Sequence, residues 1–209
     1  TSGEMRNIMQ KGDLSAHISL DTLLAATHIY GLGPAEGIKG ELMILDSKAY
    51  WCKVENGLAK TSPGNSSKAA MLVYSRVPDW KSIAIAGSVK DYVSLEKTIE
   101  KLAAAHGQKP DKPFPFMIRG DISIASWHVI DWKEGATHSS DNHKQFAVHG
   151  SIINEPATLL GFYSNKHHGI FTHHSTNMHV HIMDDKKTIV GHIEEISTPT
   201  NSITLLIPQ

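Results

Sequence analysis

The sequence has little of several features that would define a class of protein directly. It contains a single cysteine, Cys52, so the chain can form neither an internal disulfide nor a cluster of thiolate metal ligands. No apolar stretch approaches the roughly 18 residues that a membrane helix needs. The 20 lysines and arginines are balanced by 21 aspartates and glutamates, and without a basic excess we expect no nucleic-acid partner. What remains is a globular protein of ordinary composition, long enough to bury a substantial core.

Histidine, by contrast, is plentiful, with 14 in 209 residues. His179 and His181 alternate with the apolar residues of the segment 178–182, so in a β-strand the two imidazoles share one face. The polar segment 184–188 suits a turn, and a second strand then carries His192. A hairpin centred on this turn places His181 directly opposite His192.

The sequence therefore predicts three converging imidazoles, two from one strand and one from its neighbour, which together are a ligand set for a metal ion. Glu194 is expected on the same side of the hairpin, across from His179. The alternative is a half-exposed strand surface on which a histidine-rich chain has gathered its histidines by chance. The apolar residues that alternate with these histidines favour the metal site, because they imply one buried or pocket-facing surface.

The rest of the chain predicts two short helices, followed mainly by strands. The first helix covers 19–27 with Ser19 as its N-cap. The second covers 94–105, with Ser94 as its N-cap and Gly107 just beyond its end. Both carry leucines at helical spacing, so each is expected to pack one face on the core.

Turn residues divide the remaining chain into strands. The segment 31–34 breaks the first helix, and 37–54 forms two strands with a turn at 46–48. A second turn contains Asn-Gly at 55–57, the strongest short hairpin signal in the chain, and 61–68 is expected to be a loop. Further strands are expected at 69–74, 114–119, 122–131, 146–153, 157–163, 168–172 and 202–207.

This order of elements predicts a β-rich α+β protein of two sheet-based halves. Residues 1–107 form a mixed-sheet half that carries the short helices, and residues 108–209 form a β half that carries the histidine hairpin. The proline-containing segment 108–113 is the expected exposed connection between the halves, within one compact unit.

Several polar residues are candidates to join the three histidines. Glu41 begins an apolar strand, where it either faces water at a sheet edge or faces the pocket as a fourth ligand or a general base. Arg119 and His128 lie on neighbouring expected strands and are candidates to bind an anionic substrate or to move a proton. The histidine pairs at 167–168 and 173–174 are expected to be solvated, and they are weaker candidates for entrance residues or for adventitious metal binding.

The chain resembles the α-acetolactate decarboxylase family from about Ser15 to Pro208. The segments that carry the resemblance are Gly31-Leu32-Gly33, Gly40-Glu41-Leu42-Met43-Ile44-Leu45-Asp46, Leu160-Gly161-Phe162-Tyr163-Ser164, Gly169-Ile170, and His179-Val180-His181 followed by Gly191-His192. The last pair of motifs, with the spacing between them, is the most specific.

The resemblance implies a zinc-dependent lyase with His179, His181 and His192 as zinc ligands and Glu41 as an active-site carboxylate. Its substrate would be 2-acetolactate or a related 2-hydroxy-3-keto acid. Zinc would act as a Lewis acid while carbon dioxide leaves, and protonation of the resulting enediolate would give a hydroxyketone such as acetoin. A small-molecule substrate and a homodimer are both compatible with this resemblance.

Two departures from the family are expected to matter. Aligned through Gly120-Asp121, His128 stands where the family has an active-site arginine, and Arg119 is a candidate to replace that arginine. The family also has an active-site glutamate in a C-terminal extension. This sequence ends at 207–209, so we expect that glutamate to be missing. With both changes, a different substrate or a different reaction remains possible.

Two other kinds of function remain as alternatives. One is a cupin-like iron or manganese oxygenase, with Asp185 offered for the carboxylate that such sites place after their two histidines. The other is a non-catalytic zinc-binding relative whose site is closed to substrate. The sequence begins at Thr1, and an exported protein with a cleaved leader and a cytoplasmic protein both fit.

Overall fold

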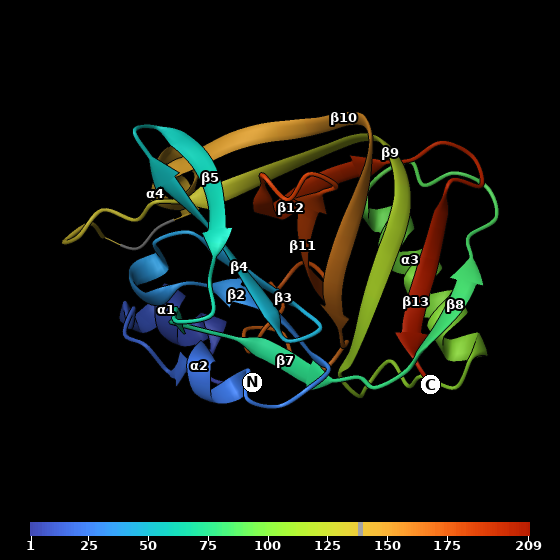
Figure 1. The fold of residues 1–209 in the computed structure, drawn as a ribbon, viewed down its shortest axis with the longest axis horizontal. Helices are drawn as coiled ribbons and strands as arrows, with labels where there is room; N and C mark the ends of the chain where they lie inside the picture. Colours follow the sequence, from blue (N-terminus) through green and yellow to red (C-terminus); the bar gives the residue numbers. More distant parts are fainter. Residues whose placement is uncertain (138–139) are drawn as a thin grey trace.

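The computed structural model describes residues 1–137 and 140–209, and for 140–141 the backbone only. Two antiparallel sheets dominate it, as expected for a β-rich α+β protein (Figure 1). The described helices are α1 (Met5–Lys11), α2 (Leu20–Leu23), a 3-10 turn (Glu36–Ile38), α3 (Tyr92–Ala105) and α4 (Ser140–Gln145). The strands are β1 (Ile18–Ser19), β2 (Ile29–Pro34), β3 (Glu41–Leu45), β4 (Lys48–Glu55), β5 (Leu58–Pro63), β6 (Lys68–Ala69), β7 (Val73–Arg76), β8 (Trp80–Ala84), β9 (Phe114–Ile130), β10 (Ala147–Tyr163), β11 (Met178–Asp184), β12 (Val190–Ser197) and β13 (Ile203–Pro208).

The larger sheet has the order β10-β11-β12-β9-β13-β8, and the smaller has the order β5-β4-β3-β2-β7. β9 and β10 are long strands that run side by side in Figure 1 and pair along their whole length. Because β10 also pairs with β11, β11 with β12, and β12 with β9, these four strands close into a ring. The histidine hairpin is therefore held on both of its edges.

Two predicted strand breaks were wrong, because β9 and β10 each run on where two strands were expected. Gly120 has a φ of 143°, and a Cβ there would lie 2.0 Å from the carbonyl oxygen of Ser202. Asn154 has a φ of 52°. These residues bend the strands without ending them, since pairing resumes on both sides of each bend.

The predicted hairpin turns are confirmed. β3 and β4 join through Asp46 and Ser47, and β4 and β5 join through Asn56 and Gly57. All four residues have positive φ, as the tight turns of two-residue hairpins require. The polar turn between β11 and β12 is fixed by Asp184, whose carboxylate accepts hydrogen bonds from the Ile189 backbone and the Thr188 hydroxyl, both at 2.7 Å.

The helices differ from the prediction at their starts and lengths. The first is only the four residues of α2 after Ser19, because the chain enters β2 at Ile29, and the predicted break at 31–34 is part of that strand. The cap of α3 is Asp91 rather than Ser94. Ser94 completes a reciprocal capping box with Asp91, so the helix begins earlier than expected.

Other segments also depart from the sequence-based expectation. Helices α1 and α4 were not predicted. The expected loop at 61–68 is partly strand, since β5 runs to Pro63. The expected strand at 168–172 is instead a turn closed by a single bridge between its end residues. This turn still carries buried side chains, Phe171 and Thr172, which hold it against the core.

One buried core joins the two sheets. Leu32 and Met43 of the smaller sheet and Phe116 and Leu159 of the larger sheet belong to the same cluster. On its other face the smaller sheet packs Leu42 and similar side chains against α2. The division of the chain at residue 107 stays a prediction, although β8, which precedes it, already belongs to the larger sheet.

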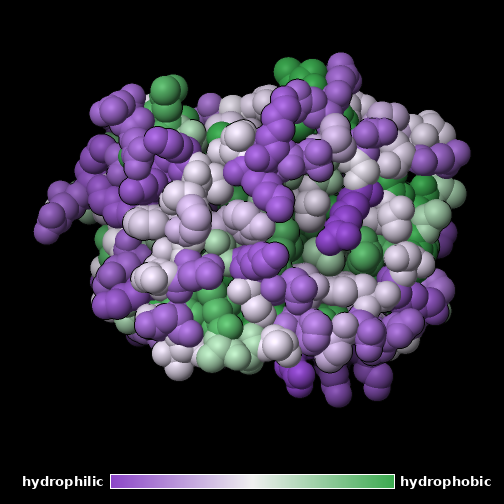
Figure 2. Space-filling model, viewed as in Figure 1, coloured by the Kyte–Doolittle hydropathy of each residue, from purple (hydrophilic) through white to green (hydrophobic). Residues whose placement is uncertain are grey.

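The outer surface is mostly hydrophilic on the face drawn in Figure 2, where hydrophobic atoms show as scattered small areas. In the part of the chain that the structure describes, no helix is both long and apolar enough to cross a bilayer.

The pairing of β9 with β10 depends on two glycines that lie opposite aromatic rings. Gly161 is paired with Phe116, and Gly150 with Trp127. A Cβ would lie 2.2 Å from the Phe116 ring at Gly161 and 2.3 Å from the Trp127 ring at Gly150. Each aromatic side chain thus covers the backbone of the glycine across from it.

We predict that Gly161→Ala lowers the free energy of unfolding by about 1–3 kcal/mol, because the added methyl group overpacks the fully buried Phe116 ring. Urea denaturation followed by circular dichroism measures the change. Ser151→Ala, on an exposed part of the same strand, is the control and should stay within about 0.5 kcal/mol of the parent. An unchanged midpoint for Gly161→Ala would contradict this packing argument.

Candidate metal centre

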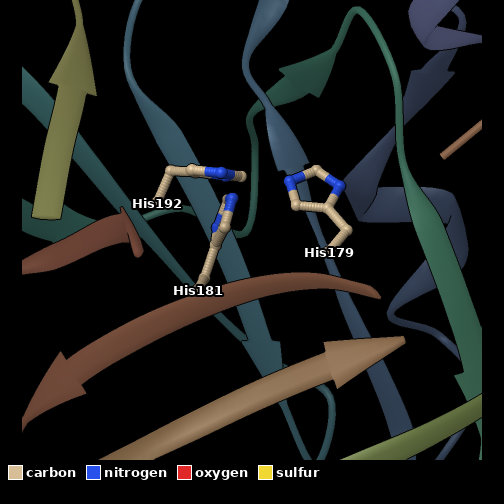
Figure 3. Close-up of side chains that lie close together, drawn as sticks. All are labelled: His179, His181 and His192. Atoms are coloured by element: carbon tan, nitrogen blue, oxygen red, sulfur yellow. The ribbon is translucent and has the colours of Figure 1, made fainter. Parts of the chain in front are cut away.

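Three histidines of the β11–β12 hairpin converge as the sequence predicted. His181 of β11 is paired with His192 of β12, and His179 lies two residues before His181 on the same face. One nitrogen from each ring lies within 4.8 Å of the others. Figure 3 shows the three rings pointing into one common space.

Burial and hydrogen bonding leave two of these rings, His179 and His181, with a free nitrogen. His181 is fully buried, and its Nδ1 donates a hydrogen bond of 2.9 Å to the Leu42 carbonyl oxygen, so Nε2 is the unprotonated nitrogen. His181 Nε2 and His179 Nδ1 are both buried without a hydrogen-bond partner among the described residues. A buried nitrogen without a partner is costly unless it binds something, and a metal ion is a suitable partner.

The protonation of the three rings also suits metal binding. Burial lowers the pKa of His181 to about 3. Burial likewise holds the pKa of His179 and that of His192 well below the ordinary value, and nearby imidazoles add to the effect. All three rings are therefore neutral at physiological pH, as metal ligands must be. Three neutral imidazoles beside an open cavity fit the ligand set of a catalytic zinc ion.

Glu41 faces the site and not the solvent. It begins β3, on the same face as Met43, which packs in the shared core, and its side chain is almost completely buried. Its Oε2 lies 3.4 Å from His181 Nε2. Burial raises the pKa of Glu41 to about 7, against the opposing effect of His128. The candidate metal site therefore lies between the two sheets, with a carboxyl from one and imidazoles from the other.

His128 extends the histidine cluster along a row of paired residues. On β9 it is paired with His192 of β12 on one side and with His149 of β10 on the other. With His181 across from His192, four imidazoles form one row across four strands. The centroid of the His128 ring lies 4.9 Å from that of His192 and 5.9 Å from that of His149.

Glu194 lies on the expected side of the hairpin. It was expected across from His179, but its partners are His128 and His149. The described β11–β12 pairing reaches His181 and His192, and the register of β12 against β9 shifts between Ile193 and Glu195. The Glu194 carboxylate lies 3.0 Å from His128 Nδ1 and 3.4 Å from His149 Nδ1. The hydrogen bond from His128 is the main reason why the pKa of Glu194 falls below its ordinary value.

A cavity of about 280 Å³ opens beside these groups. Four of the predicted site residues line it, and α1 contributes three of its apolar lining residues. The lining residues are Met5, Ile8, Met9, Pro34, Ile38, Glu41, Met71, His128, Ile130, His143, Lys144, Ala147, His149, His173, His179, His192 and Glu194.

Arg119 and the remaining histidine candidates lie in different places. Arg119 is exposed on the same strand as His128, and among the described residues it does not line the cavity, so it does not stand in for an arginine there. His167 and His168 bond to Ser164 and Asn177 outside the cavity. His173 does line it, with its ring centroid 5.5 Å from that of His192, which agrees with an entrance position.

Several residues around the cavity were not singled out from the sequence. Met5, Ile8 and Met9 of α1 follow helical spacing, which is a signal for an amphipathic helix even in so short a segment. His149 gave no local signal, because only the pairing of β10 with β9 brings it to the site, and Lys144 lines the cavity from α4, which was not predicted.

Comparisons with known proteins identify the family and the fold of the chain. The sequence matches the alpha-acetolactate decarboxylase family model over residues 4–207. None of the curated proteins matches the sequence. The fold is similar to that of alpha-acetolactate decarboxylase from Bacillus subtilis strain 168, with a TM-score of 0.78 and 16% identity, covering 99% of this chain and 84% of the other.

Two further solved structures share the fold. Acetolactate decarboxylase from Bacillus subtilis subspecies spizizenii has a TM-score of 0.78 and 17% identity, covering 99% of this chain and 84% of the other. A Staphylococcus aureus protein of unknown function, similar to alpha-acetolactate decarboxylase, has a TM-score of 0.75 and 16% identity, covering 98% and 82%. Since the family match spans nearly the whole sequence, this chain belongs to the alpha-acetolactate decarboxylase family.

Proposed function

We propose that this protein is a zinc-dependent carboxy-lyase that decarboxylates 2-acetolactate, or a related 2-hydroxy-3-keto acid, to a hydroxyketone. One observation carries the proposal: in a chain of this family, one nitrogen from each of three histidines converges on one point beside a cavity, and two of these histidines, His179 and His181, are buried with an unpartnered nitrogen. His179, His181 and His192 are the proposed zinc ligands, and Glu41 and His128 are the proposed catalytic residues.

The three imidazoles supply neutral donors, which suits zinc better than the harder cations that prefer oxygen ligands. Bound there, zinc would supply a Lewis acid for the ketone and hydroxyl oxygens of the substrate. A structural zinc site is closed by four protein ligands, whereas here a cavity reaches two of the three histidines. The open side favours an enzyme over a non-catalytic metal-binding protein.

The reaction breaks the bond between the carboxylate carbon and its neighbour, and a proton must replace the departing carbon dioxide. Glu41 is suited to hold that proton on its carboxyl group, because it is buried beside His181 and lines the cavity. His128 faces the same cavity from the opposite sheet and can hydrogen-bond the polar groups of the substrate. The apolar side chains of α1 exclude water around the reacting carbon.

The first test combines zinc content with turnover of racemic 2-acetolactate. The parent protein should bind one zinc per chain and release carbon dioxide and acetoin. His181→Ala should lose the zinc, and activity should fall roughly 1,000-fold or more, because a Lewis acid stabilises the transition state by several kcal/mol. Elemental analysis and a carbon dioxide assay measure the two quantities.

His168→Ala is the matched control, since this exposed histidine bonds to Asn177 outside the cavity and should leave both readings unchanged. One bound zinc without any turnover of acetolactate would rule out the decarboxylase proposal and leave the metal site. A parent protein that binds no zinc would rule out both.

The second test concerns Glu41. Glu41→Gln keeps the shape of the side chain and removes its ability to carry the proton, so kcat should fall about 100- to 10,000-fold while zinc remains bound. Stability to urea should not decrease, because the change removes an ionisable group from a buried position. Glu36→Gln, at an exposed position in the neighbouring turn, should behave like the parent. An unchanged kcat in Glu41→Gln would exclude the proposed role.

A further inference from the structure

The cavity contains a second polar cluster, which is separate from the three proposed metal ligands. Glu194 of β12 lies between His128 of β9 and His149 of β10, within 3.0 Å and 3.4 Å of their Nδ1 atoms. Exposure decreases along this cluster, from 45% for the His149 side chain to 38% for Glu194 and 20% for His128. The cluster thus runs from the mouth of the cavity to the edge of the metal site.

His128 is the central member, because it also contacts one of the proposed metal ligands, His192. Its ring lies 4.9 Å from that of His192. The charge that His128 carries when protonated acts on Glu41 and on all three ligands, lowering the pKa of each. The orientation of this one ring therefore bears on every proposed catalytic group.

The hydrogen bond to Glu194 determines which nitrogen of His128 carries hydrogen. An ionised carboxylate has only acceptor atoms, so the partner nitrogen must donate. In the 3.0 Å contact that nitrogen is Nδ1, and Nε2, on the other edge of the ring, is left for a ligand in the cavity. When the ring is neutral, Nε2 is then an acceptor, suited to a hydroxyl group.

We propose that Glu194 is a positioning residue that holds His128 by its Nδ1–H group, so that Nε2 is presented to the hydroxyl of a substrate in the cavity. This arrangement resembles the carboxylate that orients the histidine of a hydrolase triad and the carboxylates that orient metal-bound histidines. An arginine at residue 128 would offer only hydrogen-bond donors to the cavity. His128 held by Glu194 instead offers an acceptor.

The role in substrate binding rests on the proposed function, whereas the orientation of His128 does not. The bulge in β12 supports the orientation, because it changes the register at the point where Glu194 meets the two histidines. Glu195, the next residue on the strand, is also exposed, has the same charge and is paired with Ser126. Removing the Glu195 carboxylate is therefore the matched control for removing the Glu194 carboxylate.

The test uses the full-length, zinc-loaded protein and the variants Glu194→Ala, Glu194→Gln and Glu195→Gln. Two-bond nitrogen–proton NMR spectra, at a slightly alkaline pH at which histidines are neutral, show which ring nitrogen of His128 is protonated. His128→Gln identifies the signal by its loss. In the parent, hydrogen should reside on Nδ1. In Glu194→Ala it should shift toward Nε2, the form that an unpartnered imidazole prefers.

The kinetic readings should follow the spectra. Glu194→Ala should lower kcat/KM roughly 10- to 100-fold with one zinc still bound, as substitutions of orienting residues do. Glu194→Gln should largely restore the parent values, since its amide oxygen can accept the same hydrogen bond, and Glu195→Gln should match the parent.

Two results would overturn the proposal: hydrogen on Nε2 of His128 in the parent, or an unchanged tautomer and kcat/KM in Glu194→Ala. If the parent does not turn over acetolactate, the proposed function fails. The spectra then still decide whether Glu194 sets the orientation of His128.

Discussion

The pairing of β11 with β12, which sets His181 opposite His192, is the constraint on which the site depends. Side chains alternate along a strand, so a shift of one residue would turn the histidines of one strand to the other face. Asp184 fixes the turn from inside, and the neighbouring strands β10 and β9 hold the hairpin on both edges. His179 and His181 therefore remain buried with unpartnered nitrogens in a strand that is paired on both edges.

The part of the site that could be predicted is the histidine hairpin, because its residues lie close together in the sequence. The alternation around His179 and the short polar turn are enough to bring His192 into position. Glu41 was recognised as a candidate, but only packing of the smaller sheet on the larger one excludes the water-facing alternative. No periodicity in β3 could have decided between the two.

The rest could not be predicted, because it arises from pairing between distant strands. His149 meets His128 only because β10 runs back along β9, and the prediction had divided both strands at their turn-type residues. Glycine and asparagine usually mark turns, yet here partner strands on both sides keep the ladders continuous through them. The same long pairing moves Arg119 away from the cavity, although it lies on the same strand as His128.

The closeness of the three candidate metal ligands in the sequence has a consequence for the order in which the site is assembled. The loop that must close to bring His179, His181 and His192 together is a single hairpin, so the chain entropy lost is small. Glu41 and His128 come from strands far away in the sequence and reach the hairpin only when both sheets have packed. The three histidines therefore meet through one hairpin, whereas the complete candidate site, with Glu41 and His128, requires both sheets to pack.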